Sequence, residues 1–313
     1  MIEHTFPFDP TCGWSEADLL AAGPPETAPG DFAAFWRATY EETLALSPEA
    51  ACEPLWSPEP GVRLFALRYR GWRGLPMGSF LAVPEQPKGI LVVGHGYGGG
   101  WQPVVDSDFI TVAPSSPGFG LSLAPDIPWR VGDHVLHRID SRDDYVLRAA
   151  VSAVWHAASV VCARHPAFAG RLFYSGGSYG GGIGALALPW DARFRAGRLD
   201  VPTFGHHPLR LRYPCTGSGE AVRAYAAAHP GVGEVLRYYD AATAATFIDK
   251  PVVVLPALFD PTVVPPGQFA VANAIPERWR TRFILPAGHY SVPENTPVYE
   301  TAKRAWERLA AEG

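Results

Sequence analysis

The spacing of hydrophobic residues changes character at about Gly89. Before this point, Val62 to Arg70 and Met77 to Val83 alternate or run apolar on either side of a segment with two glycines. This pattern predicts an antiparallel pair of strands at the edge of a sheet. After Gly89, apolar runs typical of buried strands alternate with helical segments. Such an alternation predicts an α/β fold, with a mostly parallel central sheet and helices on both faces.

Helical spacing marks both ends of the chain. An aromatic stripe at i, i+3, i+4 and i+8 follows a possible cap at Asp31, and it predicts a core-packed helix. A long helix is expected from Ser141 to Arg164, with Ser141 as its cap, and another from Pro297 to Ala311. The stripe consists of Phe32, Phe35, Trp36 and Tyr40, and the later strands are expected at Gly89 to Val93, Asp108 to Ala113, Arg171 to Gly176, Arg198 to Val201, Pro251 to Phe259 and Arg282 to Leu285.

The chain is expected to form one domain over residues 1–313, with an N-terminal arm over residues 1–60. Residues 205–247 depart from the alternating pattern and contain helical segments such as Glu220 to His229. An insertion at this place is expected to form a small helical lid over the site.

The most informative motif is Gly-Gly-Ser-Tyr-Gly at Gly176 to Gly180, where an apolar strand breaks into glycines and then turns helical. A serine on such a strand-to-helix turn is held in a strained conformation that exposes its hydroxyl. The first amides of the following helix point back toward it. Ser178 is therefore predicted to be a nucleophile.

A serine nucleophile needs a base and an orienting acid, which follow it in the order acid and then histidine in α/β hydrolases. Asp260 ends the apolar run Pro251 to Phe259, and His289 lies in the loop after Arg282 to Leu285. A neutral imidazole accepts the serine proton, and a buried carboxylate fixes its tautomer. Ser178, Asp260 and His289 are therefore predicted to be the catalytic residues. Asp240 and Asp249 are rivals for the acid, but neither ends an apolar strand run. His206 and His207 could line a pocket, and His289 is preferred as the base by its position.

The predicted strand at Gly89 to Val93 runs into the glycine-rich segment Gly94 to Gly100, which contains His95 and Tyr97. This segment looks like the His-Gly oxyanion loop of esterases, which supplies one N–H while the residue after the nucleophile supplies a second. The expected donors are the backbone amides of Tyr97 and Tyr179, which would also contact the substrate.

The glycines after Ser178 permit one rival interpretation. Gly180 to Ala185 fits G-x-G-x-x-A, and Asp200 follows about 20 residues later, as in a dinucleotide fingerprint. Several predicted strands precede this segment, however, whereas a Rossmann unit usually opens its domain. A catalytically silent scaffold is a further alternative, and the intact triad argues against it.

Composition limits the class of partner. The chain has 313 residues, 47% of them hydrophobic, a formal net charge of -5 and a pI near 6.1, so nucleic acid is not an expected partner. The amino terminus lacks the features of a secretory signal, and no segment is expected to be apolar over the length that spans a membrane. Cys12, Cys52, Cys162 and Cys215 show no metal-binding spacing. A cytoplasmic enzyme without a metal and without membrane association is expected.

Together these motifs resemble those of carbohydrate esterase family seven, the acetyl xylan esterases and cephalosporin C deacetylases. The resemblance implies an α/β-hydrolase fold and cofactor-free hydrolysis of short acyl esters by a homohexamer, with Ser178, Asp260 and His289 as the triad and the Tyr97 and Tyr179 amides as oxyanion donors. The alternative is a carboxylesterase or peptidase of the same fold that acts on a larger acyl group. The resemblance is carried by Asp31 to Trp36, His95 to Gly99, Gly176 to Gly182, Asp200 to Pro202, Leu258 to Asp260 and Gly288-His289.

The chain departs from the family pattern at three places beside the predicted site. Tyr179 stands where the family usually has glutamine, Pro117-Gly118-Phe119 replaces an Arg-Gly-Gln turn, and Tyr290 replaces a glutamate. Charged groups are thus exchanged for apolar or aromatic ones. A repacked pocket is expected, while the backbone donor at residue 179 survives the exchange.

Overall fold

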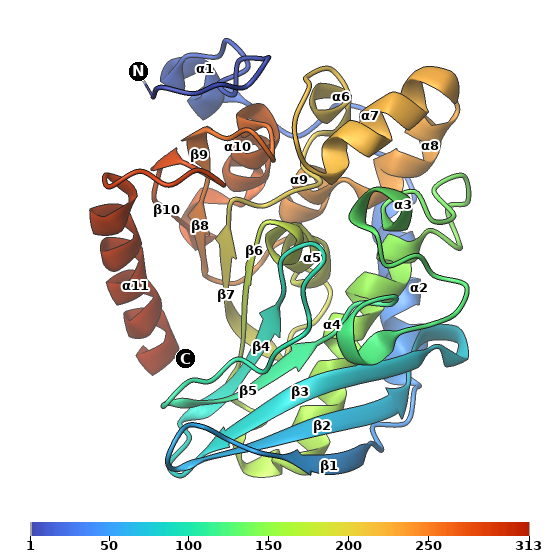
Figure 1. Ribbon diagram of the computed structural model, residues 1–313, viewed down its shortest axis with the longest axis vertical. Coiled ribbons are helices and arrows are strands. Elements are labelled where there is room, and N and C mark those ends of the chain that lie inside the picture. The colour runs from blue at the N-terminus through green and yellow to red at the C-terminus, as the bar shows by residue number, and fades with distance from the viewer. Residues whose placement is uncertain (1, 313) are drawn as a thin grey trace.

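The computed structural model describes residues 2–312 and is built on a sheet of nine strands in the order β1-β2-β3-β5-β4-β6-β7-β8-β10 (Figure 1). Strands β1, β2, β3 and β5 pair antiparallel, and the strands from β5 through β4 to β10 pair parallel. The predicted α/β-hydrolase fold class is confirmed. The strands are β1 (Ala51–Leu55), β2 (Val62–Arg70), β3 (Pro76–Pro84), β4 (Gly89–Gly94), β5 (Phe109–Pro114), β6 (Leu172–Gly177), β7 (Phe194–Asp200), β8 (Val252–Leu255), β9 (Ala257–Phe259), β10 (Arg280–Arg282) and β11 (Leu285–Ala287).

Helices cover both faces of the sheet (Figure 1). Alternate side chains of the central strands face opposite layers, so Val92 and Tyr174 join the core with α4 and α5, while Leu91 and Phe173 pack on Trp306 of α11. The helices are α1 (Glu16–Ala21), α2 (Phe32–Leu44), α3 (Val131–His134), α4 (Val146–Arg164), α5 (Tyr179–Ala187), α6 (His207–Arg210), α7 (Ser218–Ala228), α8 (Val232–Leu236), α9 (Ala241–Ala245), α10 (Pro265–Ala274) and α11 (Asn295–Glu312), and short 3-10 turns lie at Trp72–Gly74, Gly120–Ser122, Pro166–Phe168, Arg237–Tyr239 and Glu277–Trp279.

The predicted antiparallel pair is present, but it is not the edge of the sheet. Strand β1 pairs outside β2, with Ala51 opposite Arg68. Its sequence, ACEPL, contains Glu53 and Pro54 and does not alternate, because no residue of this strand is buried. A proline and a glutamate are typical of an exposed edge strand and conceal it from a hydrophobicity pattern.

The apolar run at Pro251 to Phe259 forms two strands instead of one. The chain bends at Pro256, so that β8 stays in the large sheet while β9 pairs in parallel with β11. The expected strand at Arg282 to Leu285 is divided in the same way between β10 and β11. A proline has no N–H to donate to the ladder, which accounts for the break. Because β9 and β11 are parallel neighbours, the residues that follow them, Asp260 and Gly288-His289, lie at the same end of this pair.

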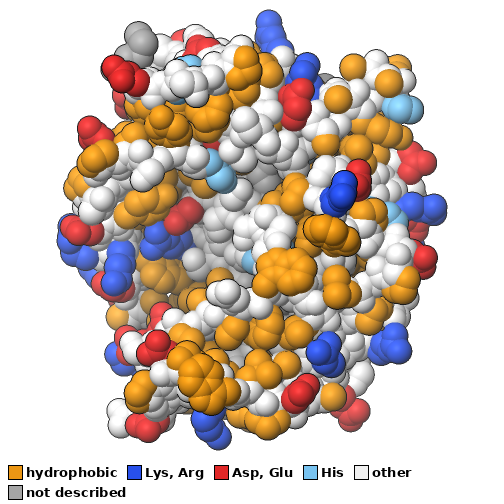
Figure 2. Space-filling model, in the orientation of Figure 1, with side chains coloured by type: hydrophobic (Ala, Val, Ile, Leu, Met, Phe, Trp, Pro, Cys, Tyr) orange, Lys and Arg blue, Asp and Glu red, His pale blue; other side chains and the backbone are white. Residues whose placement is uncertain are grey.

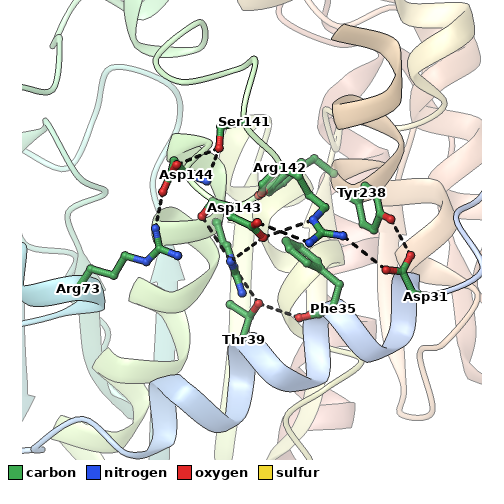
Figure 3. A network of polar contacts seen from close by, with 11 residues as sticks. Asp31, Phe35, Thr39, Arg73, Ser141, Arg142, Asp143, Asp144 and Tyr238 are labelled. Carbon is green, nitrogen blue, oxygen red and sulfur yellow. Dashed lines mark hydrogen bonds and ion pairs between the residues drawn. The ribbon is translucent and has the colours of Figure 1, made fainter. Parts of the chain in front are cut away.

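The long helix α4 begins at Val146, five positions after the expected start at Ser141. Ser141 caps a turn instead, because its hydroxyl accepts a hydrogen bond from the Asp144 amide at 3.2 Å. Figure 3 shows that Asp144 also binds Arg73. Asp143 pairs with Arg148 of the helix. The acidic residues thus join neighbouring elements and do not form the first turn of a helix.

The aromatic stripe of α2 packs in the core as predicted, with Phe32, Phe35 and Trp36 buried. Asp31 makes no side-chain cap. Its carboxylate accepts from the Tyr238 hydroxyl at 2.6 Å and lies 3.5 Å from Arg142, a contact visible in Figure 3. The N-terminal arm is therefore linked to the end of the segment over residues 205–247.

Helix α4 is long and apolar enough, by length and composition, to cross a membrane, contrary to the expectation that no segment is apolar over such a length. Of its most apolar window, 83% is buried inside the protein, where it packs against α2 and α5. Its apolarity is that of a central core helix.

Candidate active site

Ser178 lies between the end of β6 and the start of α5, with φ 55° and ψ −113°. A positive φ is strained for a residue with a side chain, and it is maintained by surrounding backbone contacts. The Ser178 amide donates to the Asp200 carbonyl at 2.8 Å, and its carbonyl accepts from Thr203 at 3.1 Å. A Cβ on Gly180 would lie 2.4 Å from the Gly94 oxygen, so only glycine permits this approach of α5 to β4.

Asp260 follows β9 and is 1% exposed. One of its oxygens, Oδ1, accepts from the Thr262 and Val263 amides at 2.8 and 3.0 Å. The other, Oδ2, accepts from Gln268 Nε2 and contacts His289 Nδ1, both at 2.8 Å. The carboxylate is thus fully hydrogen-bonded and fixed in orientation.

His289 follows β11 and completes a linear relay. Its Nδ1 lies 2.8 Å from Asp260 Oδ2, and its Nε2 lies 2.9 Å from Ser178 Oγ. With Nδ1 donating to the carboxylate, Nε2 is left to accept the serine proton. Gly288 is required beside it, because a Cβ at this position would lie 2.3 Å from Asp260 Oδ2. The structure therefore brings together the three residues that were predicted to act as acid, base and nucleophile.

Gln268 of α10 was not foreseen from the sequence. Besides binding Asp260, its Nε2 donates to the Val263 carbonyl at 2.6 Å, and its Oε1 accepts from the Ala257 amide at 2.9 Å. The side chain is fully buried. The available signal was an amide in a mostly apolar helix that starts soon after Asp260, which does not identify its partner.

The loop after β4 carries the Tyr97 amide, and two histidines hold this loop in place. His95 Nδ1 donates to the Gly96 carbonyl at 2.7 Å, and its Nε2 accepts from the Ser116 amide at 3.0 Å. Burial lowers the pKa of His95, which agrees with a neutral ring in this tautomer. His95 is therefore a structural residue of the loop.

The second histidine is His134 of α3. It joins the Tyr97 hydroxyl at Nδ1 and the Pro117 carbonyl at Nε2, each at 2.8 Å. Burial lowers the pKa of His134 to about 4, so the ring is neutral near pH 7 and its Nδ1 accepts from Tyr97. Within residues 2–312, the amides of Tyr97 and Tyr179 have no acceptor in the chain, so both remain free to donate.

Aromatic packing occupies the places where the sequence departs from the family pattern. The Tyr179 ring is 2% exposed and lies 4.2 Å from the Tyr97 ring and 5.5 Å from His95, measured between centroids. Phe119 is fully buried against His134 at 4.5 Å. Tyr290 turns away from the triad, and its hydroxyl donates to the Glu3 carbonyl at 2.9 Å. Two of the three departures, Tyr179 and Phe119, thus place buried aromatic rings against the oxyanion loop and its supporting histidines.

The rival interpretations of the site find no support in the geometry. Asp240 caps α9, and the exposed Asp249 contacts Lys250 at 3.2 Å, so neither reaches His289. Asp200 pairs with Arg198, both of its oxygens at 3.0 Å from the guanidinium. The glycines at the start of α5 pack directly against backbone and leave no room for a pyrophosphate. Among residues 2–312 there is no group of three or more His, Cys, Asp or Glu side chains that could hold a metal.

Figure 2 shows that the face drawn is hollowed near its middle and that hydrophobic side chains surround the hollow. The exposed apolar residues of the loops after β4 and β5 are Trp101, Val104, Val105, Leu123 and Trp129. Trp101 folds back on the oxyanion loop, because its indole N–H donates to the Gly98 carbonyl. Apolar contact area is therefore available close to the Tyr97 amide.

Comparison with known proteins agrees with this description. Residues 18–115 match the acetyl xylan esterase family. The acetyl xylan esterase from Paenibacillus sp. R4 is 20% identical over 95% of this chain and 99% of its own, with a TM-score of 0.81. Acetyl xylan esterase 1 from Thermoanaerobacterium sp. JW/SL YS485 is 18% identical over 95% and 98%, with a TM-score of 0.79. An acylaminoacyl peptidase from Pyrococcus horikoshii is 14% identical over 86% of this chain and 43% of its own, with a TM-score of 0.60.

The fold is that of the α/β hydrolases, and the Ser–His–Asp relay is the arrangement that serine hydrolases use. Within this class, the chain resembles carbohydrate esterase family seven, the acetyl xylan esterases. The family match and the two neighbours that span nearly the whole chain confirm the resemblance predicted from its motifs.

Proposed function

We propose that this protein is a serine esterase that removes short acyl groups, acetyl above all, from small esters such as acetylated xylo-oligosaccharides. The observation that carries the proposal is the relay in which His289 lies 2.9 Å from the Ser178 hydroxyl and 2.8 Å from the Asp260 carboxylate. This contact geometry lets one imidazole accept the serine proton while it remains oriented by a buried acid.

The mechanism follows from the roles of these groups. Ser178 Oγ attacks the ester carbonyl while His289 Nε2 takes its proton, and the Tyr97 and Tyr179 amides stabilise the oxyanion. His289 then gives the proton to the departing alcohol, which leaves an acyl group on Ser178. A water molecule, activated by the same histidine, attacks the acyl-enzyme and releases the acid.

The decisive experiment replaces the nucleophile. Ser178→Ala is expected to lower the turnover of p-nitrophenyl acetate by at least about a thousandfold, because the covalent step is lost. The folded state is checked by circular dichroism. Undiminished turnover in a folded variant would exclude Ser178 from the reaction.

An acyl-length series separates short-acyl hydrolysis from the larger-acyl alternative. Tyr179, Tyr97 and Phe204 pack closely beside the nucleophile, with the Tyr179 and Phe204 centroids 5.8 Å apart. We therefore expect activity to fall steeply beyond propionyl or butyryl esters. Hydrolytic activity that increases with acyl length up to octanoyl esters would favour the carboxylesterase or peptidase interpretation.

Three finer features belong to the proposal and rest on the family resemblance and the sequence. They are deacetylation of cephalosporin C, assembly as a homohexamer, and a cytoplasmic location. We also propose that residues 205–247, which carry α6 to α9, act as a lid. Light scattering during gel filtration tests the hexamer, and release of acetate from cephalosporin C tests that substrate.

A further inference from the structure

Arg210, at the end of α6, is a buried cation without a counter-ion. Its side chain is 4% exposed, and no carboxylate of residues 2–312 lies within ion-pair distance of it. Its Nη1 has no hydrogen-bond acceptor in the chain. Its contacts are the Phe204 ring, 5.1 Å from the guanidinium carbon, and the Ser218 hydroxyl, 3.3 Å from Nη2. Burying an unpaired charge costs several kcal/mol, so a role in binding is the physical explanation to test.

The guanidinium lies against the positive end of a helix. Helix α7 (Ser218–Ala228) starts after Gly217, which provides no side-chain cap. A Cβ on Gly219 would lie 3.4 Å from Arg210 Nε, which places the guanidinium at the first turn. Glu220 is engaged elsewhere, with Arg223 at 2.5 Å. An arginine and an uncapped helix N-terminus together favour an anion.

Arg210 and the first turn of α7 are connected with the triad through neighbouring residues. Phe204 separates Arg210 from Tyr179, the residue after the nucleophile, and the Phe204 and Tyr179 rings are 5.8 Å apart. On the other side, the Thr216 amide donates to the Pro261 carbonyl at 2.7 Å, directly after the acid. Figure 1 shows α6 and α7 above α5. Contacts through Phe204 and Thr216 thus link the α6–α7 segment, which carries Arg210, to the residues that follow the nucleophile and the acid.

We propose that Arg210 and the first turn of α7 bind a carboxylate carried by the ester substrate, so that the enzyme selects short acyl esters with an anionic group. This inference rests on the proposed esterase function. The guanidinium offers two parallel N–H donors that match a carboxylate. Because Nη1 is sealed from solvent, the α6–α7 segment must open for the anion to enter.

The test compares esters that differ only in charge. Acetoxyacetate is paired with its methyl ester, and monomethyl succinate with methyl butyrate, and kcat/KM is measured by acid release at low salt. The measured quantity is the kcat/KM of the charged ester divided by that of its neutral partner. In at least one pair, Arg210→Met is expected to lower this ratio by about tenfold or more, because a charge-assisted hydrogen bond to the substrate is lost. Arg212→Gln, which removes an exposed arginine of the same segment, should leave the ratio unchanged. An unchanged ratio for Arg210→Met in both pairs would overturn the proposal.

Calorimetry gives a second measurement that does not depend on turnover. Acetoxyacetate and monomethyl succinate are titrated into Ser178→Ala and into Ser178→Ala/Arg210→Met, with free acetate as a separate arm. The site is supported if Ser178→Ala binds an anionic ester and Ser178→Ala/Arg210→Met does not. Equal binding by the two proteins refutes it. Binding of acetate alone would refute recognition of the ester. If the wild type hydrolyses no ester, the esterase proposal fails while this titration still decides the anion site.

The stability of Arg210→Met separates a binding role from a structural one. If Arg210 serves binding, removing an unpaired buried cation should not lower the melting temperature, so Arg210→Met is expected to be at least as stable as the wild type. A structural role predicts a lower melting temperature. If Arg210→Met does not fold, Arg210→Lys retains the charge but not the two-donor fork, and it should lose the preference for charged esters. Full retention of that preference in the lysine variant would contradict recognition by the guanidinium.

Discussion

At the scale of single residues, orientation of the acid depends on neighbours that do no chemistry. Asp260 receives two backbone amides and the Gln268 side chain, which leaves Oδ2 directed at His289. Each donor restricts the rotation of the carboxyl group. Gln268 is thus a positioning residue, since it acts on the reaction only through Asp260.

Replacement of Gln268 tests this role. Gln268→Ala removes a donor from Asp260 and the acceptor of the Ala257 amide, which leaves buried polar groups unpaired. We expect kcat to fall about tenfold or more and the free energy of unfolding to fall by about 2 kcal/mol. Rates on p-nitrophenyl acetate and urea denaturation measure the two effects. As the control, Asn273→Ala in the same helix removes an amide that binds the N-terminal arm and not Asp260, so it should lower stability alone. Equal rates for the two variants would contradict the role of Gln268.

The Tyr97 hydroxyl gives a second test at this scale. Tyr97→Phe keeps the proposed oxyanion amide but removes the hydrogen bond to His134 that fixes the loop. A neutral hydrogen bond contributes about 1 kcal/mol, so we expect kcat to fall roughly fivefold with little change in KM. Tyr40→Phe removes a comparable hydroxyl contact, with Asp191, away from the site and serves as the control. A change confined to KM would show that the hydroxyl contacts substrate instead.

At the scale of elements, the site depends on how closely α5 approaches β4. Gly180→Ala would place a Cβ 2.4 Å from the Gly94 oxygen, and backbone on both sides prevents relief. Overpacking of this kind costs about 1–3 kcal/mol or more. We expect a clear loss of stability in thermal denaturation. Gly177→Ala is the matched control, since its Cβ would make an ordinary contact at 3.7 Å with Asp200. Equal melting temperatures would show that the turn tolerates a wider spacing.

The elements also show what a sequence pattern can predict. Central strands such as β4 and β6 are apolar throughout because both faces are buried, so their positions and the residues after them were foreseen. Strand β1 has no buried residue, and Asp144, just before the start of α4, pairs with Arg73, which is distant in the sequence. Tertiary contacts of this kind leave no local signal. For the same reason the sequence did not single out Gln268 and Arg210, because their proposed roles depend on residues that are distant along the chain.

At the scale of the whole molecule, several parts of the chain meet around buried, neutral histidines. His134 joins α3 to the two loops beside the nucleophile, and His207 starts α6. Burial lowers the pKa of His134 to about 4 and that of His207 to about 3. These rings must lose their proton when the chain folds in acid.

The sign of the pH dependence follows from this difference. Between the unfolded value of about 6.5 and the lowered folded values, the unfolded chain binds more protons than the native protein. Stability therefore increases with pH through this window and is lost as the pH falls from about 6.5 toward 4. Each histidine contributes up to about 1.4 kcal/mol per pH unit. Burial raises the pKa of Asp240, so this carboxyl group contributes to the pH dependence of stability with the opposite sign. The pH dependence of the wild type alone therefore does not isolate the contribution of the histidines.

Single variants separate these contributions. Urea denaturation of the wild type at pH 7.5, 6.0 and 5.0 should show a free energy of unfolding that falls with acidification, and His134→Gln should show a shallower fall because one proton-linked group is absent. Glutamine retains a donor and an acceptor for Pro117 and Tyr97, which limits the direct loss of stability. His229→Gln changes an exposed histidine and should leave the slope unchanged. If His134→Gln and the wild type have the same slope, the buried ring does not couple folding to pH.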